Sequence, residues 1–390
     1  MLSRCWVTLA IILFVLPTMP AMAKDALHPF DLWQHGALRG ANIGENRGDV
    51  DLKVLRSWGA NVVQFCFPDT CNLESPYEPR PEGFATADEL IRQASEAGLY
   101  VVIVTFRGPG HAHDDDFRIY HDPAAQEAYA RMWRGIAAHY KDNPAVVGYD
   151  IMGEPHSGDE LVSQGMSRAE AARALKGTLG DWTAFSRKIT KAIREADSYT
   201  PVLVESTGWA YPQLFDFLEP TGDPRTVYVV HFYSPRRFTH QGIPGEPELD
   251  GPLPYPGAIP GHVEPDQQWD QKVVEQTLSH VRRFQERYHV PVFAGEFGCV
   301  RWAPAATNYL RDTIELFEKW RWSWAYWRFR GSYDTWDIEK LPDRSDASRH
   351  QHTPMLDLYR SYFSHNKLFA GPPAAPGPLM PPAASGGDCP

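Results

Sequence analysis

The chain has 390 residues, of which 43% are hydrophobic and 22% are charged, and its formal net charge is −11 at pH 7. This length suits either two ordinary domains or one large α/β barrel. An acidic chain of this kind argues against nucleic acid as a partner.

Residues 1–23 have the pattern of a secretory signal peptide. Arg4 is their only charge, the run from Val7 to Leu16 is almost wholly apolar, and Ala21-Met22-Ala23 matches the small-residue cleavage pattern. The apolar run is too short for a stable membrane span. We therefore expect cleavage after Ala23 and a secreted or periplasmic protein with no membrane anchor.

From about residue 36, extended and helical patterns alternate along the chain. The apolar extended segments predict strands at residues 38–43, 61–67, 100–106, 202–205, 227–232, 292–295 and 322–327, with a further strand that starts at Val146. The amphipathic segments predict helices at residues 49–58, 86–97, 129–140, 180–196, 266–288 and 303–319. Asp49 and Thr86 are the expected N-caps of the first two helices, and a Pro/Gly-rich loop is expected from Ser234 to Pro265.

Eight strands that alternate with helices predict a single α/β domain, a (β/α)8 TIM barrel, over residues 24–369. An open, doubly wound sheet is the alternative, but no glycine-rich phosphate-binding fingerprint follows any of the strands. Residues 370–390 contain seven prolines and four glycines, so they are predicted to form a disordered tail.

Two glutamates follow predicted strands. Glu154 follows the strand from Val146 and precedes Pro155, and Glu296 follows the strand that ends at Gly295. In a (β/α)8 barrel, the carboxyl ends of the strands form the active-site mouth, so both side chains should point into it. Such a pair suits retaining glycoside hydrolysis, in which one carboxylate attacks the anomeric carbon and the other protonates the leaving oxygen. The alternative is that both glutamates form structural salt bridges.

Four motifs, in order along the chain, resemble those of glycoside hydrolase family 5, the cellulase-like enzymes of the clan A retaining glycosidases. The motifs are Gly148-Tyr149-Asp150-Ile151-Met152-Gly153-Glu154-Pro155-His156, His231-Phe232-Tyr233, Ala294-Gly295-Glu296-Phe297-Gly298 and Trp324-Ala325-Tyr326-Trp327. The similarity extends from about Leu38 to Phe363.

The resemblance implies roles for five of these residues. Glu154 would be the acid/base and would hold the proton in the free site, and Glu296 would be the nucleophile. Tyr233 would donate a hydrogen bond to Glu296, His231 would lie near it, and Trp327 would form an aromatic floor for the sugar. The alternative for His231 is a core histidine on an apolar strand. No cofactor is implied, and the cysteines lack the spacing and the histidine partners of a metal site.

Four residues at three sites depart from the family pattern, and all belong to the shell that contacts the sugar in the family. Gly153 stands where the family has an asparagine that bonds the 2-hydroxyl, Gln64 stands where it has an arginine, and Phe106 and Arg107 stand where it has a histidine pair. The substrate's first ring therefore differs from ordinary glucose or mannose, or catalysis is weak or absent.

Other features leave alternatives open. Six arginines follow strand ends, namely Arg107, Arg236, Arg237, Arg301, Arg328 and Arg330. They could bind an anionic glycan. They could instead pair with acidic residues of the same loops, namely Asp114, Asp115, Asp116, Asp334 and Asp337. Residues His111 to Asp116 could bind a cation or form a solvated loop. Cys66, Cys71, Cys299 and Cys389 could form disulfides after export, with connectivity that spacing does not determine.

The sequence therefore predicts an exported, monomeric, cofactor-free retaining β-glycosidase that hydrolyses a β-linked poly- or oligosaccharide, anionic or substituted if the arginines bind it. It does not identify the glycan or decide between endo and exo action. It also does not decide whether water or a second sugar attacks the glycosyl-enzyme intermediate. The second hypothesis is a catalytically silent glycan-binding barrel.

Overall fold

A closed barrel of eight parallel strands forms the centre of the protein in the computed structural model, which describes residues 29–43, 51–112, 117–261, 265–330 and 334–368. The strands lie around the barrel in the order β1-β10-β9-β6-β5-β4-β3-β2. Their bounds are β1 Arg39–Ile43, β2 Val62–Cys66, β3 Tyr100–Val104, β4 Val146–Asp150, β5 Val202–Glu205, β6 Thr226–Phe232, β9 Val292–Phe297 and β10 Ser323–Tyr326. The predicted (β/α)8 fold is therefore confirmed.

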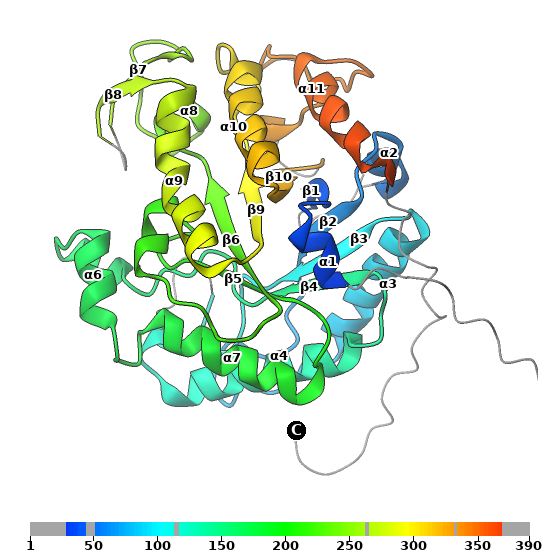
Figure 1. Cartoon of the computed structure of the whole chain (residues 1–390), viewed down its shortest axis with the longest axis vertical. Helices are drawn as coiled ribbons and strands as arrows, with labels where there is room; N and C mark the ends of the chain where they lie inside the picture. The colour runs from blue at the N-terminus through cyan, green and yellow to red at the C-terminus, as the bar shows by residue number, and fades with distance from the viewer. Residues whose placement is uncertain (1–28, 44–50, 113–116, 262–264, 331–333, 369–390) are drawn as a thin grey trace, which may run out of the picture.

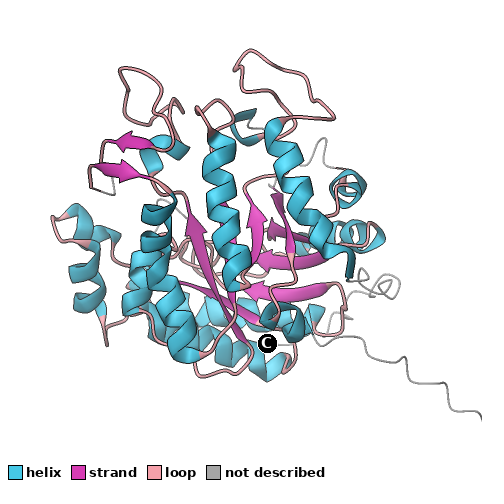
Figure 2. Cartoon of the chain, turned by 45° about the horizontal axis from the view of Figure 1, so that its top comes forward, coloured by secondary structure: helices cyan, strands magenta, loops and turns pink. Residues whose placement is uncertain are grey.

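Helices surround the strands, as Figures 1 and 2 show. The α-helices are α1 Pro29–Gln34, α2 Leu52–Ser57, α3 Glu82–Glu96, α4 Pro123–Tyr140, α5 Asp159–Ser163, α6 Arg168–Leu175, α7 Trp182–Ala196, α8 Arg236–Thr239, α9 Gln271–Tyr288, α10 Ala306–Trp320 and α11 Pro354–Phe363. Short 3-10 helices are η1 Arg118–Tyr120, η2 Pro212–Phe217, η3 Asp334–Trp336 and η4 Ser364–Leu368. Each long helix turns its apolar stripe to the barrel, as the buried Trp133 and Ile136 of α4 illustrate.

The lower half of the barrel interior is apolar. Val62, Leu203, Val229 and Phe293, each in the first part of its strand, belong to one buried cluster there. Trp33 of α1 belongs to the same cluster; its indole N–H donates to the Val147 carbonyl at 2.8 Å, and its ring contacts Phe293. The helix α1, which the sequence analysis did not predict, therefore closes the end of the barrel opposite the mouth.

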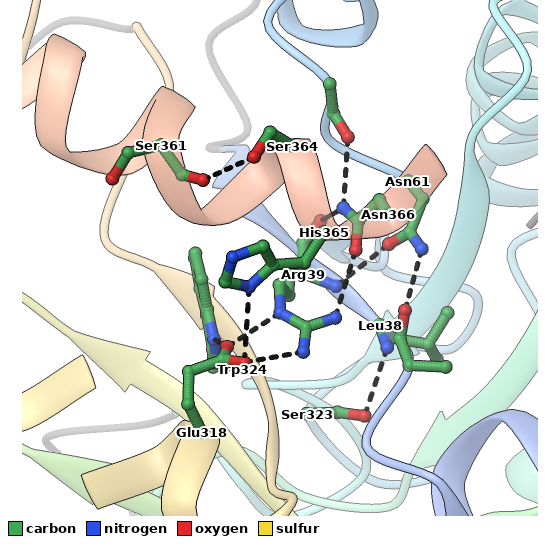
Figure 3. Close-up of polar contacts among 12 residues, drawn as sticks. Leu38, Arg39, Asn61, Glu318, Ser323, Trp324, Ser361, Ser364, His365 and Asn366 are labelled. Atoms are coloured by element: carbon green, nitrogen blue, oxygen red, sulfur yellow. Dashed lines mark hydrogen bonds and ion pairs between the residues drawn. The ribbon is translucent and has the colours of Figure 1, made fainter. Parts of the chain in front are cut away.

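The N-terminal ends of β1 and β10 are held together by a partly buried polar network (Figure 3). Arg39 forms a bidentate ion pair with Glu318 at 2.6 and 2.7 Å, and this pair lowers the pKa of Glu318 although burial alone would raise it. Trp324 donates to the same carboxylate at 2.9 Å, and Asn366 donates to the carbonyls of Arg39 and Gly59. The network ties the last described segment to the strands that close the barrel.

Some predicted element boundaries were wrong. The N-cap of α2 is Asp51, whose side chain accepts from the Lys53 N–H, whereas Asp49 lies outside the described residues. The helix α3 begins at Glu82 and so contains Thr86 instead of being capped by it. The expected helix from residue 266 begins only at Gln271, because Gln267–Trp269 forms strand β8, which pairs with β7 (Gly257–Ile259) beside α9 (Figure 1).

Within the described part of the chain, no helix is long and apolar enough to cross a membrane. The expected signal peptide, residues 1–23, and the expected tail, residues 370–390 with Cys389, lie outside the described residues.

The close approach of β1 and β2 supplies a test of the fold. A Cβ atom added to Gly40 would lie 1.7 Å from the Val62 carbonyl oxygen, so Gly40→Ala should lower the free energy of unfolding by about 3 kcal/mol or more. Gly135, inside α4, has no atom within 4 Å of such a Cβ, and Gly135→Ala should instead raise stability by about 1 kcal/mol. Guanidinium unfolding of both variants measures the difference, and equal stability of the two would contradict the observed register.

Candidate active site

The upper half of the barrel interior is polar. Gln64, Glu205 and His231 lie two residues beyond Val62, Leu203 and Val229, so they face the same interior one layer nearer the mouth. Asp150 lies two residues beyond Gly148, and a Cβ atom added to Gly148 would point at the interior side chains of Leu203 and Trp33. All four polar side chains are buried.

Glu154 and Glu296 meet at the mouth. One oxygen of each carboxyl and one ring nitrogen of His231 all lie within 4.8 Å of one another. Glu296 belongs to β9 and is 5% exposed, whereas β4 ends at Asp150 and Glu154 lies four residues farther on. The expectation that Glu154 directly closes its strand was therefore wrong. Its φ of 53° is a left-handed conformation, which turns the side chain back toward the barrel.

His231 and Tyr233, both predicted site residues, contact the two glutamates. His231 Nδ1 lies 3.0 Å from Glu154 Oε1 and 3.7 Å from Glu296 Oε2. The Tyr233 hydroxyl donates to Glu296 Oε2 at 2.9 Å. Burial and the neighbouring carboxylates raise the pKa of Tyr233, so its hydroxyl stays protonated and remains a donor.

Two buried carboxyl groups under this pair escaped the sequence analysis. Glu205 Oε2 accepts the Glu154 backbone N–H at 2.6 Å. Glu205 Oε1 lies 3.2 Å from His231 Nε2, which is close enough for an ion pair, but the two atoms are not aligned for a hydrogen bond. Asp150 is fully buried beside Glu205. An acidic residue at the end of an otherwise apolar strand, as in Val202-Leu203-Val204-Glu205, was the signal that could have identified both.

The protonation states follow from burial and charge. Burial, more than the charges of Glu154 and Glu205, raises the pKa of Glu296 to about 8, although His231 and Tyr233 counteract this. Burial by itself would lower the pKa of His231, but Glu205, Glu296 and Glu154 together raise it well above its ordinary value. The glutamate pair therefore carries one proton at neutral pH beside an imidazolium. The sequence analysis expected that proton on Glu154, which remains a prediction.

The aromatic side of the mouth is formed by β10 and the segment after it. Trp327 is partly buried, and its backbone N–H donates to the Phe297 carbonyl at 2.9 Å, which places it next to the strand of Glu296. Trp336, which the sequence analysis did not single out, packs edge-on against Tyr233 at 5.8 Å and against His240 at 5.0 Å. These contacts hold the Tyr233 ring in place.

Two of the departures from the family pattern form one steric unit. A Cβ atom on Gly153 would lie 2.5, 2.6 and 2.8 Å from three ring atoms of Phe106. The Gly153 N–H donates to the Thr105 carbonyl at 2.9 Å, so the backbone has little room to move away. The Phe106 ring therefore fills the space that a side chain at position 153 would need.

Gln64 and Arg107, the remaining residues that depart from the family pattern, differ in their surroundings. Gln64 is fully buried, and neither side-chain amide atom has a hydrogen-bond partner among the described residues. Arg107 is exposed and lies 3.5 Å from Asp69, and no contact joins it to the glutamate pair in the described part of the chain.

The arginines near the mouth contact groups other than those we expected. Arg236 pairs with Glu246 and Arg330 with Glu339, each through two nitrogen atoms, and Arg301 donates to the carbonyls of the segment that follows η3. Of the expected acidic partners, Asp337 pairs with Arg349, and Asp114, Asp115 and Asp116 lie outside the described residues.

The remaining candidates lie elsewhere. His111 is buried between the rings of Tyr120 and His156, which gives it a packing role. Cys66 and Cys71 are half-buried, whereas Cys299 is a buried free thiol whose pKa burial raises well above its ordinary value.

Among the described residues, the one group with donor atoms close enough to hold a metal ion is Glu154, His231 and Glu296. The same atoms lie at hydrogen-bond or ion-pair distances from one another and from Tyr233, an arrangement that suits proton exchange between the carboxyl groups.

Comparisons with known proteins identify the family. The family model described as cellulase (glycosyl hydrolase family 5) matches residues 37–332, well over half of the chain. The match includes both glutamates, His231, Tyr233 and Trp327.

The curated relatives are distant in sequence. Endoglucanase 3 of Fibrobacter succinogenes is 23% identical over 340 residues, which are 77% of this chain and 49% of that protein. Endoglucanase C of Acetivibrio thermocellus is 21% identical over 305 residues, or 72% of this chain and 83% of that protein. The chain thus spans about half the length of the first relative and most of the second.

Solved structures share the fold. Cel5A of Thermotoga maritima, determined in complexes with cellobiose and with mannotriose, superimposes with a TM-score of 0.64 at 21% identity, covering 85% of this chain and 99% of that one. At this identity the likeness shows the common barrel.

The contact between Gly153 and Phe106 can be tested by a double-mutant cycle. Gly153→Asn alone should destabilise the protein by roughly 1–3 kcal/mol, because its side chain overlaps the Phe106 ring. Adding Phe106→Ala should recover part of that loss, which gives a coupling energy of at least about 1 kcal/mol in thermal or denaturant unfolding. Gly251→Asn, at a glycine with no atom within 4 Å of an added Cβ, is the matched control. Additive effects at 106 and 153 would contradict the steric unit.

Proposed function

The chain belongs to glycosyl hydrolase family 5, and from that premise we propose that it is a retaining β-glycosidase that hydrolyses a β-linked glycan. Glu296 is the nucleophile and Glu154 the acid/base. The single observation that carries the proposal is the approach of their carboxyl oxygens to within 4.8 Å. Retaining enzymes hold this pair roughly 5–5.5 Å apart, whereas inverting enzymes need about 6.5–9.5 Å to admit a water molecule.

In the first step, a Glu296 oxygen attacks the anomeric carbon while Glu154 gives its proton to the leaving oxygen. The pair begins with one proton, and the positive charge that develops on the sugar favours the ionised form of Glu296. The proton is then on Glu154, next to the leaving group. The Tyr233 hydroxyl, 2.9 Å from Glu296 Oε2, orients the attacking carboxylate.

In the second step, a water molecule attacks the glycosyl–Glu296 ester. Glu154, ionised after the first step, takes a proton from this water, and the carbon–oxygen bond to Glu296 breaks. The pair regains one proton, and the sugar keeps its anomeric configuration. His231, 3.0 Å from Glu154 Oε1, stabilises the anionic form of Glu154 between the two steps.

The proposed subsite for the reacting sugar is atypical. Gly153 offers no amide, and Phe106 is partly exposed next to it, so this wall is apolar where the family pattern has polar groups. We propose that a face of the sugar rich in C–H groups packs on Phe106, as sugars commonly pack on aromatic rings. Trp327 supplies the floor of the same subsite.

We also propose that the protein is exported to the periplasm or secreted, because residues 1–23 have the pattern of a signal peptide. A polysaccharide or oligosaccharide outside the cytoplasm is then its substrate.

Removal of either carboxylate tests the assignment. Glu296→Ala should lower kcat/KM on aryl β-glycosides by about 10⁴-fold or more, because the nucleophile is lost. Glu154→Gln should lower kcat/KM by about 10²- to 10⁴-fold on substrates with poor leaving groups and far less on dinitrophenyl glycosides, which leave without a proton. Product analysis by NMR should show retention. A wild-type protein that binds glycans without releasing sugar would support the silent glycan-binding barrel.

The pH dependence follows from the shared proton. Because the pKa of Glu296 is raised to about 8, the pair keeps its one proton below that pH and loses it above. The doubly ionised pair cannot protonate a leaving group, so kcat/KM should fall as pH rises through about 8. With dinitrophenyl glycosides this fall should weaken. A kcat/KM that already falls near pH 5 would contradict the prediction, because the glutamate pair would then lose its proton well below pH 8.

A further inference from the structure

Glu205 is a buried acid that the two proposed chemical steps do not use. It ends β5, its side chain is 0% exposed, and it belongs to neither the nucleophile nor the acid/base position. A buried carboxylate is unfavourable unless charged or polar partners compensate for the lost water. The contacts of Glu205 therefore indicate what it does.

The first contact is with the backbone of the proposed acid/base. Glu205 Oε2 accepts the Glu154 N–H at 2.6 Å, and Glu154 has a φ of 53°. A residue with a side chain pays free energy to adopt this left-handed conformation, which persists only where the surroundings impose it. A charge-assisted hydrogen bond from the neighbouring strand is such a constraint. Without it, Glu154 could relax and move its carboxyl away from Glu296.

The second contact leads to the carboxyl of the same residue. Glu205 Oε1 lies 3.2 Å from His231 Nε2, and the opposite ring nitrogen lies 3.0 Å from Glu154 Oε1. Glu205 thus holds Glu154 at two points, directly at its backbone and through His231 at its carboxyl.

The charges around His231 are unevenly placed. Four carboxyl groups face the imidazole, and they come from three strands and one loop. They are Asp150 of β4, Glu205 of β5, Glu296 of β9 and Glu154 of the loop after β4. Burial and the adjacent Glu205 raise the pKa of Asp150. Glu154 and Glu296 exchange their proton and charge during the proposed steps, whereas Glu205 takes no part in those steps and stays beneath the imidazole throughout.

We propose that Glu205 is a positioning residue that fixes the orientation of Glu154 and keeps His231 positively charged throughout the reaction. This inference rests on the proposed glycosidase function, but one of its consequences, the charge of His231, does not depend on activity. Glu205 acts through Glu154 and His231, and its complete burial prevents it from touching the glycan.

The test compares Glu205→Gln with the wild-type protein. Glutamine keeps the shape and can still accept the Glu154 N–H, but it removes the anion. We expect kcat on an aryl β-glycoside to fall about 10- to 100-fold, the usual cost of losing a residue that orients a functional group. KM should stay within about twofold. In NMR titrations of the histidine ring nitrogens, His231 should be protonated at pH 7 in the wild type, and its titration should move to lower pH in Glu205→Gln.

Asp197→Asn is the matched control. Asp197 is also buried and also accepts backbone N–H groups, those of Tyr199 and Thr200, but it lies at the end of α7 and contacts neither glutamate. This variant should lose stability while kcat and the His231 titration stay unchanged.

Unchanged kcat or an unmoved His231 titration in Glu205→Gln would overturn the proposal. If that variant does not fold, the wild-type titration decides, because a His231 that is neutral at pH 7 would also overturn it. A wild-type protein without glycosidase activity would refute the proposed function, and the His231 titration would still report on whether Glu205 holds the charge.

Discussion

The geometry of the mouth depends on one imidazole surrounded by four carboxyl groups. His231 lies within 4 Å of oxygen atoms of Glu154, Glu205 and Glu296, and the charge of Asp150 also acts on it. Four buried anions in this space would repel one another strongly, so the site must hold protons. The imidazolium and the proton on Asp150 make the cluster stable, and one further proton remains for the glutamate pair. The same arrangement that reduces the repulsion therefore supplies the proton that glycoside hydrolysis needs.

The barrel makes this cluster possible because it separates an apolar layer from a polar one. Successive interior side chains lie two residues apart along each strand, so Leu203 faces the closed end and Glu205 the mouth. Trp33 and the apolar layer exclude water from below, and this burial raises the pKa of Asp150 in the layer above. Stability and reactivity thus come from adjacent layers of the same strands.

The wall formed by Phe106 and Gly153 shows how neighbouring positions depend on each other. The ring of Phe106 can lie against the backbone only because position 153 has no side chain. A polar side chain at 153 would in turn require a smaller residue at 106. The two departures from the family pattern are therefore one change in the shape of the subsite, and this change leaves Glu154, Glu296 and Tyr233 in contact around the mouth.

The sequence by itself determined the fold class and the identity of the main site residues. Its eight apolar segments alternate with amphipathic helices, a local pattern that burial in a parallel barrel requires. Glu154, Glu296, His231 and Tyr233 lie at or just beyond the ends of those segments. The start of α2 at Leu52 was missed because Asp49 and Asp51 are both suitable N-caps in the sequence. The start of α9 at Gln271 was missed because the short strand β8, residues 267–269, has no clear local signal before the helix.

Only the tertiary structure revealed Glu205 and Asp150 as parts of the site, the left-handed turn at Glu154, and the overlap of Phe106 with position 153. Each of these depends on distances between strands that are far apart in the sequence. Periodicity shows which face of a strand is buried, whereas the barrel register decides which buried groups meet and therefore where the protons reside.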